Sequence, residues 1–360
     1  MRGMQLGSCP RPLHEQYDAA LCDLDGVLHL GDEPVAHAAA TVATAKAAGM
    51  RFAYVTNNAS RSPDVVARRL AGMGMPAEPQ DVVTSAQAAG RTLASRLPAG
   101  AAVLVVGTDA LADEVRSVGL RPVRTVDEAG QDGPAAVVQG LASTTSYTDL
   151  AEAAVALNEG ALWVAGNTDA TLPTTRGLLP GNGALVAALE LVTGRTPLVS
   201  GKPDPALHQE SVDRVRAERP LVVGDRLDTD VLGAVRGGAD SLLVLTGVVG
   251  IRELLQAPVG SRPTYVSSDL RGLLEPHPAV TVGRSSAQCG AARATYDGEV
   301  VDADLSTDDG IRAVVALAWA VADDGGSVTL AARAVNGAAS GAASGTSSVS
   351  DGSVGPLAAR

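Results

Sequence analysis

The sequence predicts an α/β protein, and two patterns along the chain support this prediction. Short runs rich in Val, Leu and Ala alternate with longer segments in which apolar residues recur at helical spacing. Near-continuous apolar strands that alternate with helices are typical of a parallel sheet covered by helices on both faces. The chain has 360 residues, which at about 150 residues per domain suggests two or three domains.

The expected strands are short and apolar, at residues 19–23, 51–56, 102–106, 135–139, 161–165, 221–224 and 241–245. The expected helices lie between them, at residues 34–48, 63–72, 110–118, 183–193, 205–216 and 229–237. From about Val280 the pattern weakens into short pieces and one apolar helix at residues 311–321. Residues 333–360 are rich in Ala, Gly and Ser without bulky apolar periodicity, so we expect a disordered tail.

Composition narrows the functional classes. Acidic residues outnumber basic ones by 40 to 28, for a net charge of −12. This balance argues against nucleic-acid binding, which needs a basic surface, but not against a phosphorylated small molecule, because local charge decides that. No apolar run reaches the roughly 18 residues of a membrane span. The three cysteines, Cys9, Cys22 and Cys289, lack the spacing of a zinc site or a disulfide framework.

One targeting pattern needs weighing. The sequence LGSC at residues 6–9 resembles a lipoprotein cleavage box, but only MRGMQ precedes it. Such a box requires a preceding apolar segment of about 7–15 residues. We therefore expect a cytoplasmic protein.

The first polar motif, ALCDLDGVL, brings two carboxylates to the end of a strand. Residues i and i+2 of an extended chain point to the same side, so Asp23 and Asp25 can face one pocket. That pocket would lie at the carboxyl edge of the sheet, where open α/β sheets bind ligands. Alone, the motif fits a solvated strand end with an Asp-Gly turn better.

The second motif, VTNN, places Thr56, Asn57 and Asn58 at a strand-to-helix turn. A hydroxyl, side-chain amides and free backbone N–H groups can bind an anion there. Helix capping by Asn and Ser explains the same residues equally well.

The third motif, SGKPDP, contains Lys202, one of only two lysines among the 28 basic residues. A lysine ammonium can neutralise a phosphate as a compact point charge, although an exposed surface lysine remains the alternative. The fourth motif, VVGDRLDTD, ends a strand at Asp225 and brings Asp228 and Asp230 to a helix start. Carboxylates at a strand end suit Mg²⁺. For Asp228 we favour the simpler role of complementing the helix dipole.

Together, DLDGV, VTNN, GKPDP and GDRLDTD resemble the four motifs of the haloacid dehalogenase (HAD) superfamily of phosphohydrolases, over roughly residues 16–272. The segment between the second and third motifs looks like the type-two α/β cap of subclass IIA, whose Asn-x-Asp…Pro…Gly…Pro-Gly signature is similar to residues 166–183. VTNNASRS, VVTSAQ, VLVVGT, GDRLDTD, VLTGV and the tail domain more closely resemble bacterial glycerol-3-phosphate phosphatases.

The resemblance implies a domain organisation. It consists of a Rossmann-like HAD core with a parallel sheet at residues 13–83 and 178–274, an inserted cap at 84–177, a small α+β C-terminal domain at 278–332 and the tail at 333–360. The C-terminal domain would resemble part of an acetyltransferase fold. It has no clear Gly-rich pyrophosphate loop ahead of a helix, so we expect a packing or oligomerisation domain.

The resemblance also implies a mechanism. Asp23 would be the nucleophile that forms an aspartyl-phosphate, and Asp25 the general acid and then the general base. Mg²⁺ would be held by Asp23, the backbone carbonyl of Asp25 and Asp225, while Asp230 would orient a metal-bound water. The groups that would hold the phosphoryl oxygens are Thr56, Asn57, Asn58 and Lys202.

We therefore expect a Mg²⁺-dependent phosphatase of a small phosphorylated metabolite, with glycerol 3-phosphate favoured. The alternatives are phosphoglycolate, a sugar phosphate or a nucleotide, and a non-enzymatic phosphate-binding protein is the third reading. The predicted cap has few aromatic residues and no basic cluster. Of its arginines only Arg176 lies in the segment returning to the core, so a carboxylate-bearing substrate is expected to bind less well. Asn167, Asp169 and Arg176 are candidates for the leaving-group contact, but a hinge role suits them better. A homo-oligomer is possible.

Overall fold

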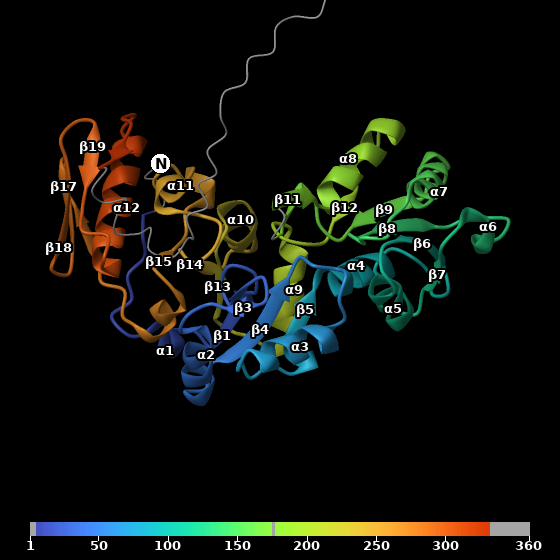
Figure 1. The fold of residues 1–360 in the computed structure, drawn as a ribbon, viewed down its shortest axis with the longest axis horizontal. Coiled ribbons are helices and arrows are strands. Elements are labelled where there is room, and N and C mark those ends of the chain that lie inside the picture. The colour runs from blue at the N-terminus through green and yellow to red at the C-terminus, as the bar shows by residue number, and fades with distance from the viewer. Residues whose placement is uncertain (1–4, 175–176, 332–360) are drawn as a thin grey trace, which may run out of the picture.

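A computed structural model describes residues 5–174 and 177–331 (Figure 1). Its central sheet has six parallel strands. Their order is β15 (Tyr265–Ser267), β14 (Asp240–Val244), β13 (Pro220–Gly224), β1 (Ala19–Asp23), β4 (Arg51–Thr56) and β5 (Val82–Thr84). The parallel α/β class that the sequence predicts is confirmed.

Successive side chains of a strand point to opposite faces of a sheet, and helices cover both faces of this one. Ala20 and Cys22 of β1 pack with α2 (Ala38–Ala47) and α3 (Pro63–Gly72). Leu21, between them, packs on the other face with α9 (Pro205–Val215) and α10 (Leu232–Gly237). Burial of both faces explains why these strands are continuous apolar runs in the sequence.

A second parallel sheet is inserted between β5 and α9, and we call it and its helices the inserted unit. Its strand order is β12 (Leu198–Val199), β9 (Leu162–Ala165), β8 (Ala136–Gln139), β6 (Ala102–Val106) and β7 (Arg121–Val123). Its helices are α4 (Ser85–Ala94), α5 (Asp109–Ser117), α6 (Val126–Ala129), α7 (Tyr147–Asn158) and α8 (Asn182–Thr193). The hairpin of β10 (Thr171–Thr174) and β11 (Gly177–Pro180) precedes α8.

The sequence places the end of this insertion at residue 177, and that boundary is too early. In the structure α8 packs against α7, and β12 extends the inserted sheet by pairing with β9. Strand β12 has only two residues, too few for an apolar run to reveal it.

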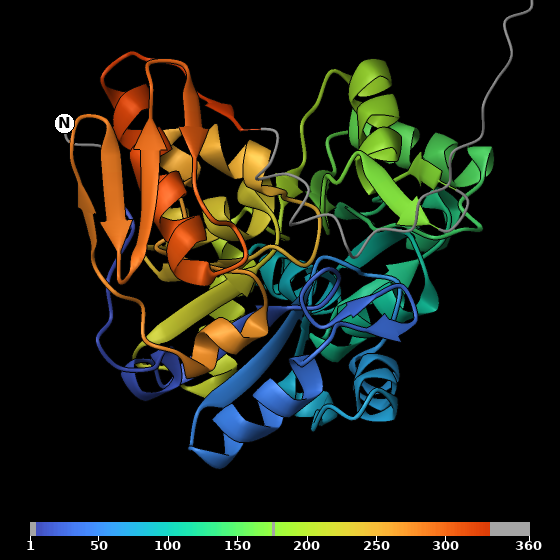
Figure 2. The same ribbon diagram turned by 60° about the vertical axis from the view of Figure 1, so that its left-hand side comes forward.

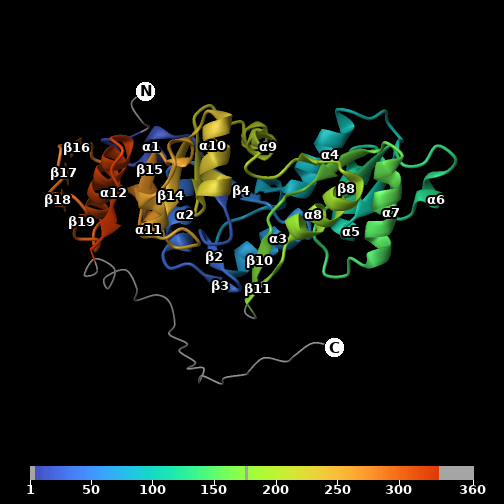
Figure 3. The same cartoon turned by 90° about the horizontal axis from the view of Figure 1, so that it is seen from above.

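A third unit lies at the end of the molecule opposite the inserted unit (Figures 1 and 3). Its sheet consists of β16 (Val280–Val282), β17 (Ser286–Cys289), β18 (Ala292–Tyr296), β19 (Val300–Asp302) and β20 (Thr329–Leu330). Helix α12 (Asp308–Asp323) packs between this sheet and α11 (Ile251–Leu255) of the central unit (Figure 2). The predicted tail at 333–360 lies outside the described residues.

The seven strands expected from the sequence are present, with ends shifted by at most one residue. The helix expected at 34–48 begins later, because Pro34 pairs in a short hairpin and His37 has a φ of 67°. The remaining elements are α1 (Leu13–Gln16), β2 (His29–Leu30), β3 (Glu33–Pro34), η1 (Pro79–Asp81), η2 (Leu227–Val231), η3 (Val259–Ser261) and η4 (Leu270–Leu274). Within residues 5–174 and 177–331, no helix combines the length and apolar character needed to cross a membrane.

The third unit shares a buried interface with the central unit. Trp319 of α12 is 1% exposed and donates from Nε1 to the Leu254 carbonyl at 2.9 Å. Arg262 donates to both carboxylate oxygens of Asp323, at 2.9 and 2.7 Å, and its guanidinium lies 5.0 Å from the Trp319 ring centroid. One hydrophobic cluster contains residues of both units, including Val266 and Leu317.

Deleting residues 278–360 should therefore lower the melting temperature and the soluble yield. Each large apolar side chain left exposed on the central unit costs about 1.5–3 kcal/mol, and Arg262 would lose its carboxylate partner. Thermal unfolding of the shortened protein tests this. The matched control ends at residue 331, where we expect no loss. A protein of residues 1–277 that is as stable, soluble and active as the full chain would show the third unit to be an independent module.

Candidate active site

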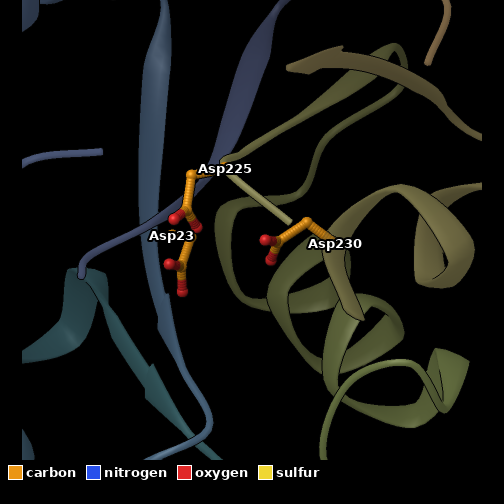
Figure 4. Close-up of side chains that lie close together, drawn as sticks. All are labelled: Asp23, Asp225 and Asp230. Carbon is orange, nitrogen blue, oxygen red and sulfur yellow. The ribbon is translucent and has the colours of Figure 1, made fainter. Parts of the chain in front are cut away.

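Three carboxylates meet at the carboxyl edge of the central sheet (Figure 4). Asp23 ends β1, Asp225 directly follows β13, and Asp230 lies in η2. Since β1 and β13 are parallel neighbours, their ends lie side by side. One carboxylate oxygen from each residue lies within 4.8 Å of the others. Asp225 and Asp230 are each 1% exposed.

Lys202 reaches into this cluster from the loop that precedes α9. Asp204 ends the loop by accepting a hydrogen bond from Ala206 N at 2.9 Å, an N-cap that starts α9 at Pro205. The Lys202 Nζ donates to Asp230 Oδ1 at 2.7 Å and also to Asp23 Oδ1. Lys202 is 4% exposed, so the alternative of an exposed surface lysine is wrong.

Burial and neighbouring charges shift the pKa values of Asp23, Asp225 and Lys202. Burial raises the pKa of Asp23 well above its usual range, against the opposing attraction of Lys202. Burial and then the charge of Asp230 raise the pKa of Asp225 to about 6. Burial alone would lower the pKa of the Lys202 ammonium, but Asp23 and Asp230 together raise it. Such shifts concentrate at functional sites.

The cluster fits a divalent cation. Asp225 Oδ2 accepts from Val248 N at 2.7 Å, while Asp225 Oδ1 is buried without a hydrogen-bond partner among the described residues. When ionised, three carboxylates exceed the single ammonium of Lys202 by two negative charges, which one divalent cation would balance. Carboxylate oxygens are the ligands that Mg²⁺ prefers.

Asp225 and Asp230 differ in their free oxygen atoms. Asp230 Oδ1 accepts from Lys202 Nζ, and its Oδ2 accepts from Arg226 N at 3.2 Å. Asp225 Oδ1 accepts no hydrogen bond from the described residues, whereas both carboxylate oxygens of Asp230 accept one. This difference favours Asp225 over Asp230 as the direct metal ligand. Asp228 lies apart and pairs with the Arg226 guanidinium at 3.0 and 2.7 Å.

Asp25 lies at the mouth of the site rather than in the carboxylate cluster. Its side chain is 71% exposed, and its Oδ1 is 3.3 Å from His29 Nδ1. The chain turns directly after it at Gly26, whose φ is 87° and where a Cβ would collide with the Asp225 carboxylate. The strand alternation that the sequence suggested therefore ends before Asp25.

The VTNN motif spans the end of β4, the other neighbour of β1: Thr56 is the last residue of the strand, and Asn57 and Asn58 follow it. Thr56 is buried, and its Oγ1 accepts from Asn58 N at 3.1 Å. The exposed Asn58 uses its side-chain oxygen locally, accepting from Ser60 N at 2.8 Å. The Asn58 side chain thus closes a local turn and does not cap α3, whose N-cap is Ser62. The side chain of Asn57 is directed toward Lys202.

A small cavity beside Asp25 contains side chains that the sequence analysis missed. Its polar lining includes His29, Arg61 and Arg69, together with Asp25, Thr56 and Asn58. The sequence analysis considered only arginines of the predicted cap as partners for a substrate carboxylate, whereas Arg61 and Arg69 lie before the cap, close behind the second motif. The sequence VTNNASRS contained the signal, since Arg61 lies three residues after Asn58.

Two of the three predicted cap candidates lie near the site. Asn167 Nδ2 donates to the Asn57 carbonyl at 2.7 Å, and Asp169 Oδ2 accepts from Asn57 Nδ2 at 3.3 Å. Burial raises the pKa of Asp169. The third candidate, Arg176, lies outside the described residues.

A parallel α/β core with an inserted unit and an aspartate-lysine cluster at its strand ends defines a class of hydrolases. The chain belongs to this class, the haloacid dehalogenase-like hydrolases. A profile described as haloacid dehalogenase-like hydrolase matches residues 20–121, and one described as HAD-hydrolase-like matches residues 199–273.

Within this class, the chain is similar to several individual phosphatases. The chain is 48% identical to the D-glycerol 3-phosphate phosphatase of Mycobacterium tuberculosis over 316 residues, which are 86% of this chain and 87% of the relative. A crystal structure of glycerol phosphate phosphatase from the same organism, in complex with magnesium, matches with a TM-score of 0.78 and 44% identity, covering 91% of this chain and 97% of that one. A p-nitrophenyl phosphatase from Archaeoglobus fulgidus matches with a TM-score of 0.66 and 30% identity, covering 72% and 98%. The expected enzyme class, a HAD phosphatase, is confirmed.

Proposed function

We propose that this protein is a Mg²⁺-dependent phosphatase that hydrolyses glycerol 3-phosphate through a phosphorylated Asp23. The buried cluster of Asp23, Asp225 and Asp230 around Lys202 is the observation that carries the proposal. This cluster brings the proposed nucleophile, a cation site and the positive charge of Lys202 together at the carboxyl edge of the central sheet. The substrate follows from the 48% identity to a D-glycerol 3-phosphate phosphatase over most of both chains.

In the first step a carboxylate oxygen of Asp23 attacks phosphorus, and the bond from phosphorus to the glycerol oxygen breaks. Asp25 gives its proton to the departing alkoxide, and its exposed position leaves it able to reach that oxygen. In the second step Asp25 takes a proton from water, which attacks the phosphorus and releases phosphate and Asp23. Covalent catalysis of this kind divides one difficult displacement into two easier ones.

The remaining residues control charge and position. Lys202 neutralises phosphoryl oxygens, and Thr56, Asn57 and Asn58 form the turn beside them. Asp23, Asp225 and the Asp25 carbonyl would hold Mg²⁺, with Asp230 orienting Lys202 and a metal-bound water. When bound, Mg²⁺ neutralises the charge that develops on the transferred phosphoryl group.

We expect kcat/KM for glycerol 3-phosphate to exceed that for phosphoglycolate, because the turns around Asn167 and Asp169 offer hydrogen-bonding partners to a neutral polyol. One well-made hydrogen bond contributes about 1 kcal/mol, or about fivefold. Purified enzyme with saturating Mg²⁺ would be compared on both substrates at one pH.

One observation favours phosphoglycolate as a second candidate. Arg61 lines the cavity beside Asp25 and forms no hydrogen bond or ion pair with residues 5–174 and 177–331, so its guanidinium could bind a substrate carboxylate. Arg69 is already held by the Gly31 carbonyl and Asp32. A preference for phosphoglycolate that disappears in Arg61→Gln would move the assignment to that substrate.

A further inference from the structure

Asn57, the residue after Thr56, contacts the inserted unit through its main-chain carbonyl. The Asn57 carbonyl accepts from Ser85 Oγ and from Asn167 Nδ2, each at 2.7 Å. Ser85 is the first residue of α4, where the chain leaves the central sheet. Asn167 lies just after β9, within the inserted unit. One main-chain group of the central unit therefore contacts the inserted unit at two points that are far apart in the sequence.

The Asn57 side chain holds the catalytic lysine loop. Its Oδ1 accepts from Lys202 N at 2.8 Å, and its Nδ2 donates to the Lys202 carbonyl at 3.1 Å. The amide thus pairs with both main-chain polar groups of one residue. The same Nδ2 lies 3.3 Å from Asp169 Oδ2, in the loop of the inserted unit between β9 and β10.

Glycine at position 201 allows this close approach. A Cβ there would lie 2.7 Å from Asn57 Oδ1 and would collide with the Gly166 carbonyl. Contacts this short cannot be accommodated by backbone atoms. The loop, the Asn57 amide and the end of β9 are therefore packed as one junction.

From these contacts we infer that Asn57 is a positioning residue, which fixes Lys202 through its side chain and couples it to the inserted unit through Asp169. The inference rests on the proposed function, and it replaces the expectation that the Asn57 side chain binds phosphate. Lysine carries its charge on a flexible stem. Fixing both main-chain groups of Lys202 limits where Nζ can lie, between Asp23 and Asp230.

Asn57→Ala should lower kcat/KM by about 100-fold, the order expected when a catalytic group is misplaced by about 1 Å. Inhibition by inorganic phosphate should weaken in parallel, because that readout depends on Lys202 and not on turnover. Asp169→Ala should have a smaller effect of the same kind. In the Asn57→Ala background it should have no further effect, since the link from Asp169 to Lys202 passes through the missing amide.

A second pair of variants covers the case in which Asn57→Ala does not fold. Asn57→Asp places a second carboxylate against that of Asp169, and the repulsion between the two should reduce activity. Adding Asp169→Asn restores a donor and an acceptor with their roles exchanged, and should recover part of the loss. The matched control is Asn158→Ala, at the exposed end of α7, which should behave as wild type.

All variants should be assayed on both glycerol 3-phosphate and 4-nitrophenyl phosphate. If wild type hydrolyses only the aryl ester, the proposed substrate is wrong, and the variant series on the aryl ester still tests the positioning role. Unchanged kcat/KM and phosphate inhibition in Asn57→Ala would overturn the inference. So would fully additive effects of Asn57→Ala and Asp169→Ala, because they would show that the two residues act separately.

Discussion

We expect Asp23→Asn to reduce steady-state turnover by roughly 10⁴-fold or more, as loss of a nucleophile does in covalent catalysis. The amide lacks the charged oxygen that must attack phosphorus. The fold should survive because the amide has nearly the same shape. Burial raises the pKa of Asp23, so its ionised form destabilises the folded protein at neutral pH. The melting temperature should therefore not fall, although Lys202 then keeps Asp230 alone of its two carboxylate partners in the described structure.

Release of inorganic phosphate and thermal unfolding would be measured on the same preparation. Asp228→Asn is a matched control, because this exposed aspartate belongs to the same region but forms an ion pair with Arg226 and lies outside the carboxylate cluster. It should retain most of the activity. Steady-state hydrolysis by a clean preparation of Asp23→Asn would exclude Asp23 as the nucleophile.

Chelation should have the second-largest effect. EDTA should abolish hydrolysis, and added Mg²⁺ should restore it. Two unit charges 4 Å apart repel by about 4 kcal/mol at an effective dielectric constant of 20. A phosphate dianion beside Asp23, Asp225 and Asp230 would meet several such repulsions, and Lys202 offsets only part of them.

Ca²⁺ should compete with Mg²⁺ and inhibit. Calcium takes more ligands at longer distances and would misplace Asp23 relative to phosphorus. The mycobacterial glycerol phosphate phosphatase has been crystallised with magnesium and with calcium. Rates would be measured across Mg²⁺ concentrations with and without Ca²⁺, and Mg²⁺ binding by calorimetry. Asp225→Asn should weaken that binding. Full activity in excess chelator would remove the metal from the mechanism.

Much of the fold was predictable because the central strands are buried on both faces. That burial requires apolar residues at the interior positions of β1, β4 and β13, and such runs are visible in a sequence. Parallel strands also end at a common edge, so the polar residues after each strand were expected to meet. Asp23 and Asp225 meet there in the structure, and Thr56 lies at the end of the neighbouring strand.

The third unit was less predictable. Strands β16 to β19 have only three to five residues each, and several of them alternate between more buried and more exposed positions. Short half-buried strands carry a weak signal in sequence. The likeness to part of an acetyltransferase fold stays a prediction.

By itself, the sequence determined the α/β class, the positions of seven strands along the chain and the residue types at the strand ends, because burial and strand alternation act on neighbouring residues. Only the tertiary structure decided where the loop side chains point. Asn57 faces Lys202, 145 residues away, and Arg61 reaches the cavity beside Asp25. Strand β12 joins the inserted sheet by main-chain pairing with β9. Each of these depends on partners distant in the chain, and no local pattern specifies which groups the fold will bring within hydrogen-bonding distance.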